Sequence, residues 1–283
     1  MTIKTVGIII GAGLMGNGIA QTCAAAGIKT IMLDINEAAV QKGLATISAS
    51  FERLIKKEKL TPAQKDSALA QIKTSISMSD FKDVDLVIEA ATENEGLKLK
   101  ILKDAEAVIR ADTIIASNTS SISITQMAAA TSRPERFIGM HFFNPVPMMA
   151  LVEIIRGLQT SDATHAAVEA LAKALGKTPI TVKNSPGFVV NRILCPMINE
   201  AIFVFGEGLA SAEEIDAGMK LGCNMPIGPL ALADLIGLDT MLNVMNVFYA
   251  GFNDSKYRPA PLLKEMVAAG YYGRKNGRGF YHY

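Results

Sequence analysis

Two isolated polar residues, His141 and Glu153, interrupt the apolar segment IGMHFFNPVPMMALVEI at residues 138–154. Histidine is suited to proton transfer near neutral pH, and an adjacent carboxylate fixes its tautomer and favours the imidazolium. Pro145 and Pro147 break the segment, and residue 147 is equidistant from the two polar residues. A hairpin centred there would make them cross-strand neighbours. We therefore predict a general base with its carboxylate; the alternatives are a core histidine bonded to backbone and a glutamate in a surface ion pair.

A glycine-rich turn near the N-terminus has the pattern of a dinucleotide-binding loop. Gly11, Gly13 and Gly16 follow the run TVGIII and open a helical pattern. Such glycines allow a tight turn, backbone contact with a pyrophosphate and close packing of helix on strand, while the helix N-terminus attracts the anion. Asp34 ends the next predicted strand, 23 residues after Gly11, where a carboxylate would accept the ribose hydroxyls. The alternative is a structural turn with Asp34 capping a helix.

The same carboxylate bears on the choice of cofactor. A negative charge at Asp34 would repel a 2′-phosphate, and residues 35–38 contain no arginine. We therefore expect NAD in preference to NADP.

Other polar residues follow predicted strands, at the sheet edge where open α/β folds bind ligands. Ser117 ends the run TIIAS, and Glu93 and Lys98 follow the run DLVIEA. Taken alone, Ser117 could cap the next helix, and Glu93 and Lys98 could be solvated at a helix start. The basic helix end at residues 53–57 similarly fits either a solvated face or contact with an anionic ligand.

Short apolar runs and longer helical patterns alternate over the first two thirds of the chain. The runs predicted as strands are residues 5–10, 29–34, 75–78, 85–90, 113–117, 136–142, 151–156 and 179–182. Helices are predicted between them, for example over 36–58 and 162–176, and Thr61 and Ser211 begin capping-box patterns. The fold class is α/β: a Rossmann-type domain with a mostly parallel sheet at residues 1–183, followed by an all-helical domain at 184–283.

Composition indicates an ordinary globular protein. The 283 residues are 49% hydrophobic and 19% charged, and 28 basic against 27 acidic residues leave a net charge of +1, so nucleic-acid binding is not expected. Three scattered cysteines without a CxxC motif argue against a disulfide framework and a metal site, and fit a reducing compartment. Neither a signal peptide nor an apolar run of ~20 residues is evident. We expect a soluble, cytoplasmic protein with no membrane association.

Seven longer motifs together resemble the L-3-hydroxyacyl-CoA dehydrogenases. They are GAGLMGNGIA (11–20), SNTSS (117–121), HFFNPVPMMALVE (141–153), NSPGFVVNR (184–192), IDAGMKLG (215–222), PIGPLALADLIGLD (226–239) and GRKNGRGFY (273–281). The resemblance covers essentially the whole chain, in order. It implies NAD-dependent oxidation of a (S)-3-hydroxyacyl-CoA, most narrowly 3-hydroxybutyryl-CoA, to the 3-ketoacyl-CoA, and the reverse reduction of acetoacetyl-CoA. It also implies a homodimer formed through the C-terminal domain.

The resemblance further implies roles for individual residues. His141 matches the catalytic base, Glu153 its orienting carboxylate, and Ser117 and Asn191 match residues that bond the substrate oxygen at C3. The NAD contacts that it implies are Gly11, Ala12, Gly13, Leu14, Met15, Gly16, Asp34, Glu93, Lys98, Ser117, Asn144 and Lys275, and the contacts to the CoA part are Ser50 and Lys57.

One position departs from the family pattern, and two alternative functions remain open. Family members often carry lysine where this chain has Ala150, which we expect to affect local charge or acyl-CoA binding and not the chemistry. One alternative function is a related dehydrogenase of a free sugar acid of the gulonate type, which the basic residues near Lys57 disfavour. The other is a non-catalytic, crystallin-like dinucleotide-binding protein, which the complete set of catalytic residues disfavours.

Overall fold

The computed structural model describes residues 2–283 of the chain. The chain divides into two compact units, the first ending at Asn184 and the second beginning at Ser185. Each unit has its own cluster of buried hydrophobic side chains.

The first unit contains one eight-stranded sheet, ordered β3-β2-β1-β4-β5-β6-β7-β8. The strands are β1 (Thr5–Ile9), β2 (Lys29–Leu33), β3 (Ile72–Ser75), β4 (Leu86–Glu89), β5 (Ile114–Ser117), β6 (Phe137–Phe142), β7 (Leu151–Arg156) and β8 (Thr178–Lys183). All neighbouring pairs are parallel except β6 and β7. The predicted Rossmann-type, mostly parallel sheet is confirmed.

The prediction for β3 was wrong in its position. A strand was expected over residues 75–78, but β3 ends at Ser75, and Met78–Phe81 form a 3-10 helix, η1. The Ser75 hydroxyl donates to Asp80 at 2.6 Å and accepts the Ser77 N–H at 3.0 Å. These local bonds turn the chain out of the sheet, because the serine side chain competes with the strand's own hydrogen bonding.

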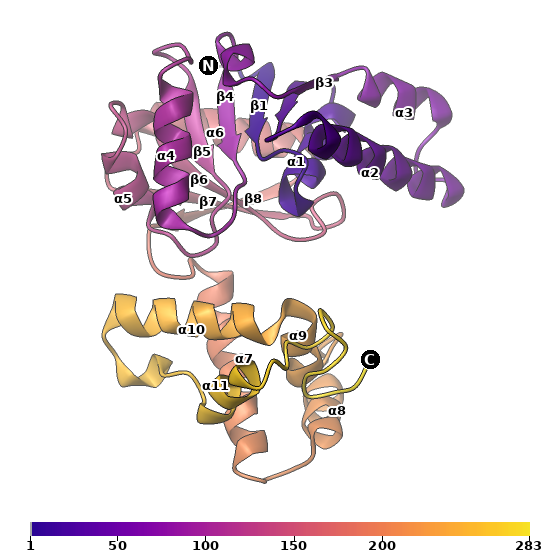
Figure 1. Cartoon of the computed structure of the whole chain (residues 1–283), viewed down its shortest axis with the longest axis vertical. Coiled ribbons are helices and arrows are strands. Elements are labelled where there is room, and N and C mark those ends of the chain that lie inside the picture. Colours follow the sequence, from indigo (N-terminus) through magenta and orange to yellow (C-terminus); the bar gives the residue numbers. More distant parts are fainter. Residues whose placement is uncertain (1) are drawn as a thin grey trace. The chain divides into compact units, whose positions relative to one another are not determined.

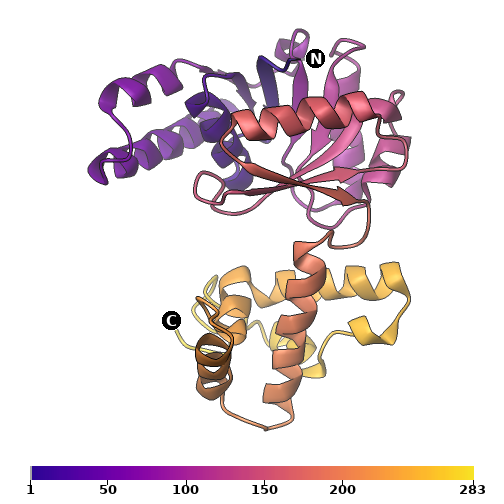
Figure 2. The same ribbon diagram turned by 180° about the vertical axis from the view of Figure 1, so that it is seen from behind.

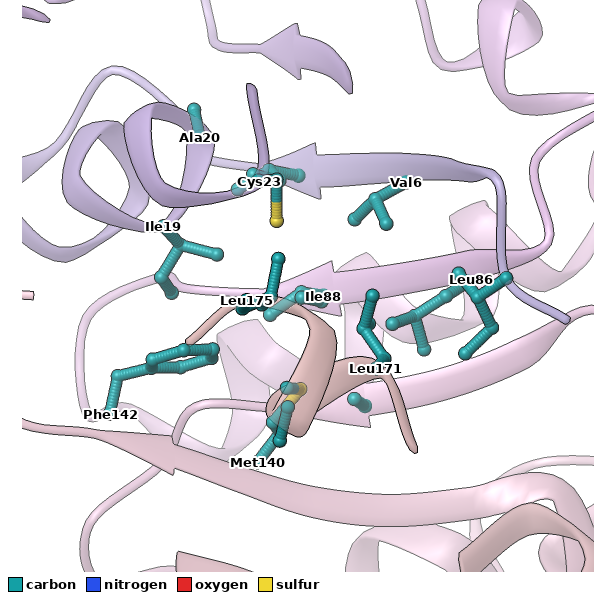
Figure 3. Close-up of a cluster of buried hydrophobic side chains, with 14 of the residues drawn as sticks. Val6, Ile19, Ala20, Cys23, Leu86, Ile88, Met140, Phe142, Leu171 and Leu175 are labelled. Atoms are coloured by element: carbon teal, nitrogen blue, oxygen red, sulfur yellow. The ribbon is translucent and has the colours of Figure 1, made fainter. Parts of the chain in front are cut away.

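Helices cover both faces of the sheet (Figures 1 and 2). Helices α1 (Leu14–Ala25) and α6 (Asp162–Ala174) lie on one face, and α4 (Glu95–Glu106) and α5 (Ile124–Ala129) lie on the other. Figure 3 shows the core beneath α1 and α6. The strands contribute Val6, Leu86, Ile88, Met140 and Phe142, the two helices contribute Ile19, Ala20, Cys23 and Leu171, and Leu175 directly follows α6. Burial on both faces explains why these strands are almost wholly apolar.

Helices α2 (Glu37–Lys56) and α3 (Pro62–Leu69) extend beyond the β3 edge of the sheet (Figure 1). Asn36 caps α2 by accepting the Ala39 N–H at 2.9 Å. Thr61 caps α3 in a capping box with Gln64, as predicted.

The second unit is helical. Its helices are α7 (Val190–Gly206), α8 (Ala212–Gly222), α9 (Pro229–Ile236), α10 (Leu238–Phe252) and α11 (Pro261–Ala268). The predicted capping box at Ser211 begins α8, and Gly237, with φ +102°, separates α9 from α10. Over residues 2–283 no single helix has both the length and the hydropathy to cross a membrane. Helices α9 and α10 meet these two criteria only when they are counted together, and the pair is bent by 97°.

Candidate active site

His141 and Glu153 face each other across the β6–β7 hairpin. They are paired in the antiparallel register, and His141 Nδ1 lies 2.8 Å from Glu153 Oε2. The histidine is 6% exposed and the glutamate is fully buried. The predicted hairpin is confirmed. Because the carboxylate accepts the Nδ1 proton, the neutral ring presents Nε2 as its basic nitrogen. The pair can therefore act as a general base that is held in one tautomer.

Ser117 lies at the end of β5, on the strand next to His141. It pairs with Gly139 of β6 in the sheet register, and Gly139 is two residues before His141. Because side chains alternate along a strand, Ser117 and His141 point to the same face. Ile124 of α5 packs over Gly139 on that face, where an added Cβ would lie 2.9 Å from its Cδ1.

A buried carboxylate beside Ser117, Glu89, was missed in the sequence analysis. Glu89 ends β4 and pairs with Ser117, whose hydroxyl donates to Glu89 Oε2 at 2.7 Å. Lys98 donates to both Glu89 oxygens, at 2.8 and 2.9 Å, and to the Ala91 carbonyl at 2.9 Å. The side chains of Glu89, Lys98 and Ser117 are each at most 1% exposed. The position of a glutamate at the carboxyl end of a buried strand was the signal that could have found it.

Lys98 was expected to be either solvated or in contact with NAD. Solvation is wrong, because the side chain is 1% exposed. Its three ammonium donors are matched by the two Glu89 oxygens and the Ala91 carbonyl. The NAD contact stays a prediction.

Glu93 organises the SNTSS turn that follows β5. Its carboxylate accepts bonds from the Thr119 hydroxyl, at 2.9 and 3.0 Å, and from the backbone N–H and hydroxyl of Ser120. Asn118 accepts the Phe142 N–H at 2.9 Å and so links the ends of β5 and β6. The turn beside Ser117 is thus tied to both neighbouring segments.

The glycine loop fits a dinucleotide. A Cβ on Gly16 would lie 2.3 Å from the Ile10 carbonyl oxygen, whereas one on Gly13 would lie 3.4 Å from it. Packing therefore requires Gly16, but within the protein Gly13 has room for a methyl group, so its absence serves the approach of a ligand. Helix α1 begins without a side-chain cap and without an acidic residue in its first turn, which suits an anion. Asp34 accepts the Ala12 N–H at 3.0 Å and closes the loop.

The remaining predicted site residues of the first unit lie in the hairpin loop and on α2. Asn144 is exposed and precedes a cis peptide bond to Pro145. Ser50, in the last two turns of α2, is half-buried, and Lys57, which directly follows the helix, is exposed. Ala150 is exposed, and its carbonyl accepts the Thr178 N–H at 2.8 Å. Ala150, where the chain departs from the family pattern, thus lies at the surface of the loop between β6 and β7.

Two predicted residues belong to the second unit. Asn191 is half-buried in the first turn of α7. Lys275 is exposed and donates to Asp239 at 2.7 Å and to the Thr240 hydroxyl at 3.0 Å. Their roles stay predictions. Across residues 2–283, no cluster of three or more His, Cys, Asp or Glu side chains could hold a metal ion.

Comparison with known proteins decides the family. Residues 5–185 match the NAD-binding domain of 3-hydroxyacyl-CoA dehydrogenase, and residues 187–283 match its C-terminal domain. The chain belongs to the 3-hydroxyacyl-CoA dehydrogenase family. The predicted family, the predicted fold class and NAD as the cofactor of this oxidoreductase are thereby confirmed.

Individual relatives of this 3-hydroxyacyl-CoA dehydrogenase are similar over their full length. A 3-hydroxybutyryl-CoA dehydrogenase from Bradyrhizobium diazoefficiens is 52% identical, covering 99% of this chain and 96% of that protein. One from Mycobacterium tuberculosis is 41% identical, covering 99% of both. The crystal structure of (S)-3-hydroxybutyryl-CoA dehydrogenase from Ralstonia eutropha is 72% identical, with a TM-score of 0.98, and covers 100% of this chain and 99% of that one.

Proposed function

We propose that this enzyme oxidises (S)-3-hydroxybutyryl-CoA to acetoacetyl-CoA with NAD, and catalyses the reverse reduction. The observation that carries the proposal is the buried His141–Glu153 pair, with 2.8 Å between Nδ1 and Oε2. The names of the full-length relatives support the substrate. NAD supplies the hydride acceptor at its nicotinamide ring.

The chain's own residues handle the proton. His141 Nε2 removes the proton of the 3-hydroxyl as hydride leaves C3, and the Glu153 carboxylate stabilises the imidazolium that forms. In the reverse direction the imidazolium returns its proton to the 3-keto oxygen. The family resemblance assigns Ser117 and Asn191 to the same oxygen, where a hydrogen-bond donor stabilises developing negative charge.

Proton transfer by His141 can be tested by substitution. We expect His141→Gln to lower the kcat for acetoacetyl-CoA by about 10²- to 10⁴-fold, with NADH binding retained, because the glycine loop and Asp34 are untouched. His165→Gln is the matched control, since His165 lies on α6 and bonds the Thr181 hydroxyl. A His141 variant with near-normal kcat would contradict the assignment.

The substrate class can be tested with the wild-type enzyme. NADH consumption is followed with acetoacetyl-CoA, with free acetoacetate and with longer 3-ketoacyl-CoA esters. We expect acetoacetyl-CoA to be the best of these, and turnover of free acetoacetate alone would contradict the proposal.

The CoA portion is proposed to contact Ser50 and Lys57 at the basic end of α2. Arg53 and Lys56 are also exposed there, and CoA carries three phosphates whose charge they would balance. Lys57→Ala should raise the KM for acetoacetyl-CoA and leave the KM for NADH unchanged. Lys42→Ala, an exposed lysine earlier on α2, is the matched control.

The homodimer is also a proposal. Leu221, Leu209 and Ile193 of the second unit are 87%, 69% and 68% exposed, which is unusual for large aliphatic side chains and typical of an interface. Light scattering should give about twice the chain mass of 30.2 kDa, and Ile193→Asp or Leu221→Asp should lower it. A cytoplasmic location is a separate proposal, which cell fractionation tests.

A further inference from the structure

A buried polar side chain in α1 has no partner within the protein. Gln21 is 3% exposed, and no hydrogen bond joins its side-chain amide to another of the described residues 2–283. Its neighbour Thr22, in contrast, donates its hydroxyl to the Gly18 carbonyl at 2.8 Å. A buried amide without a hydrogen bond is costly, and native proteins keep few of them. The position of Gln21 therefore indicates a partner from outside the chain.

Gln21 lines a pocket of about 400 Å³, which falls within the usual range of about 300–1,000 Å³ for small-molecule sites. Helices α1 and α6 form part of its wall, together with the end of α2. Met140 and Phe142 of β6 point toward α1 and α6 (Figure 3). Because side chains alternate along a strand, His141 points to the other face of the sheet. The pocket and the catalytic pair thus lie on opposite faces.

Lys177 brings a positive charge to this pocket. It lines the pocket and is 8% exposed. Its ammonium donates to the carbonyls of Val146 and Met149, and the third of its donors has no acceptor among the described residues. Burial lowers its pKa below the ordinary value, and an anion beside it would favour the charged form.

The charge of Lys177 is not balanced locally. The described residues that line the pocket include no carboxylate, and Lys177 forms no ion pair with any carboxylate of residues 2–283. A nearly buried cation gains most from a partner of opposite charge, because hydrogen bonds between ionised groups are the strong ones. The pocket is therefore suited to an anion.

The rest of the pocket favours hydrocarbon. Its large apolar side chains are Phe51, Leu54, Leu60, Pro147 and Leu175. Contact with them would remove the apolar part of a ligand from water, which is favourable in proportion to the area buried. The ligand that fits both parts has one charged head and an apolar tail.

We propose that this pocket binds a small carboxylic acid with a hydrocarbon tail, at a site separate from the active site. The carboxylate accepts one N–H of the Gln21 amide and the third proton of the Lys177 ammonium, and the tail packs against the apolar side chains. Ser50 and Lys57, the predicted CoA contacts, do not line the pocket. An acyl-CoA thioester has no free carboxylate at its acyl end and could not replace the acid in these contacts.

Calorimetric titration of the wild-type enzyme with sodium octanoate tests the site, with neither NADH nor acyl-CoA present. We expect saturable binding at one site per chain. Octanamide has the same length but no charge and should bind about tenfold more weakly, as expected for the loss of a charged hydrogen bond. Acetate, which lacks the tail, should give no measurable binding. Absence of octanoate binding, or equal binding of octanoate and octanamide, would overturn the proposal.

Two substitutions assign the contacts. Gln21→Leu should weaken octanoate binding about fivefold to tenfold, and the variant should fold because it removes a buried polar group that has no partner. Lys177→Met should abolish the preference for octanoate over octanamide. Gln126→Leu, at an exposed position on α5, is the matched control. Unchanged octanoate binding by Gln21→Leu would show adsorption elsewhere and overturn the proposal.

Competition decides whether the site is separate. Saturating acetoacetyl-CoA or NADH should leave the octanoate dissociation constant within about twofold, as expected for sites that share no contacts. Displacement of octanoate by acetoacetyl-CoA would assign the pocket to the substrate and overturn the proposal. These titrations need no turnover, so absence of activity with acetoacetyl-CoA would contradict the proposed function alone.

Discussion

The Glu153 carboxylate lies 2.8 Å from His141 Nδ1, directly opposite it in the antiparallel pair of β6 and β7. A glutamine at this position keeps the shape but loses the charge that stabilises the imidazolium. We expect Glu153→Gln to lower kcat by about 10²-fold or more with little change in NADH binding, measured by stopped-flow turnover and fluorescence titration. Glu169→Gln, on the exposed side of α6 and paired with Lys173, should leave kcat unchanged. A kcat within twofold of wild type for Glu153→Gln would remove the pair from the mechanism.

Gly13 and Gly16 should differ when each is replaced by alanine. An added Cβ would lie 2.3 Å from the Ile10 oxygen at position 16 but 3.4 Å from it at position 13. Gly16→Ala should therefore destabilise the protein by about 1–3 kcal/mol, as overpacking does, which a denaturation curve measures. Gly13→Ala should retain stability and weaken NADH binding about tenfold, equivalent to about 1.4 kcal/mol. The reverse pattern would place the ligand elsewhere.

Lys177, just after α6, ties down the loop between β6 and β7. Its ammonium donates to the carbonyls of Val146 and Met149, the latter at 2.8 Å, and burial lowers its pKa below the ordinary value. Lys177→Met leaves both carbonyls without this donor and should cost about 1–3 kcal/mol of stability. Hydrogen exchange at residues 143–150 should rise more than exchange elsewhere. Unchanged protection there would show that other contacts hold the loop, and Lys173→Met, an exposed lysine on α6, is the control.

The three thiols should differ sharply in reactivity. Burial raises the pKa of Cys23 and of Cys195 from 9.0 to about 12, whereas Cys223 is exposed. At pH 8 a chromogenic disulfide reagent should titrate one thiol in the folded protein and three in denaturant. Two or more fast-reacting thiols in the folded protein would contradict the described burial.

The same two thiols should make stability depend on alkaline pH. The folded state keeps both protons up to a pKa of about 12, whereas the unfolded chain releases them above 9.0. Stability is therefore lost as pH rises above about 9, by about 1.4 kcal/mol per pH unit for each thiol. Cys23→Ala should reduce that slope, as measured by denaturant unfolding at several pH values, and an unchanged slope would contradict the assignment.

Local patterns in the sequence were sufficient for the hairpin and the helix starts. His141 and Glu153 are close in sequence and symmetric about Pro147, so a single turn brings them together. Thr61 and Ser211 cap helices through residues three positions away. Where all partners lie within a few residues, spacing alone predicts geometry.

The buried ion pair could not be predicted in this way. Glu89 meets Lys98 nine residues later and Ser117 28 residues later, and each of these residue types is usually solvated. Their burial follows from the sheet order, which places β4 beside β5, and from α4 folding back over the strand ends. The misplaced β3 has the opposite cause, since the Ser75 side chain ends the strand through bonds with its nearest neighbours.

We propose that one carboxylate, Asp34, serves two parts of the nucleotide site. Asp34 follows β2, where it would face the adenosine ribose, and it also accepts the Ala12 N–H at 3.0 Å. Replacing Asp34 to redesign the enzyme for NADPH would remove the expected repulsion between this carboxylate and the 2′-phosphate. The same change would also remove the acceptor that holds the glycine loop at Ala12. A successful exchange of cofactor needs a second substitution that restores an acceptor for the Ala12 N–H, so the two changes must be selected together.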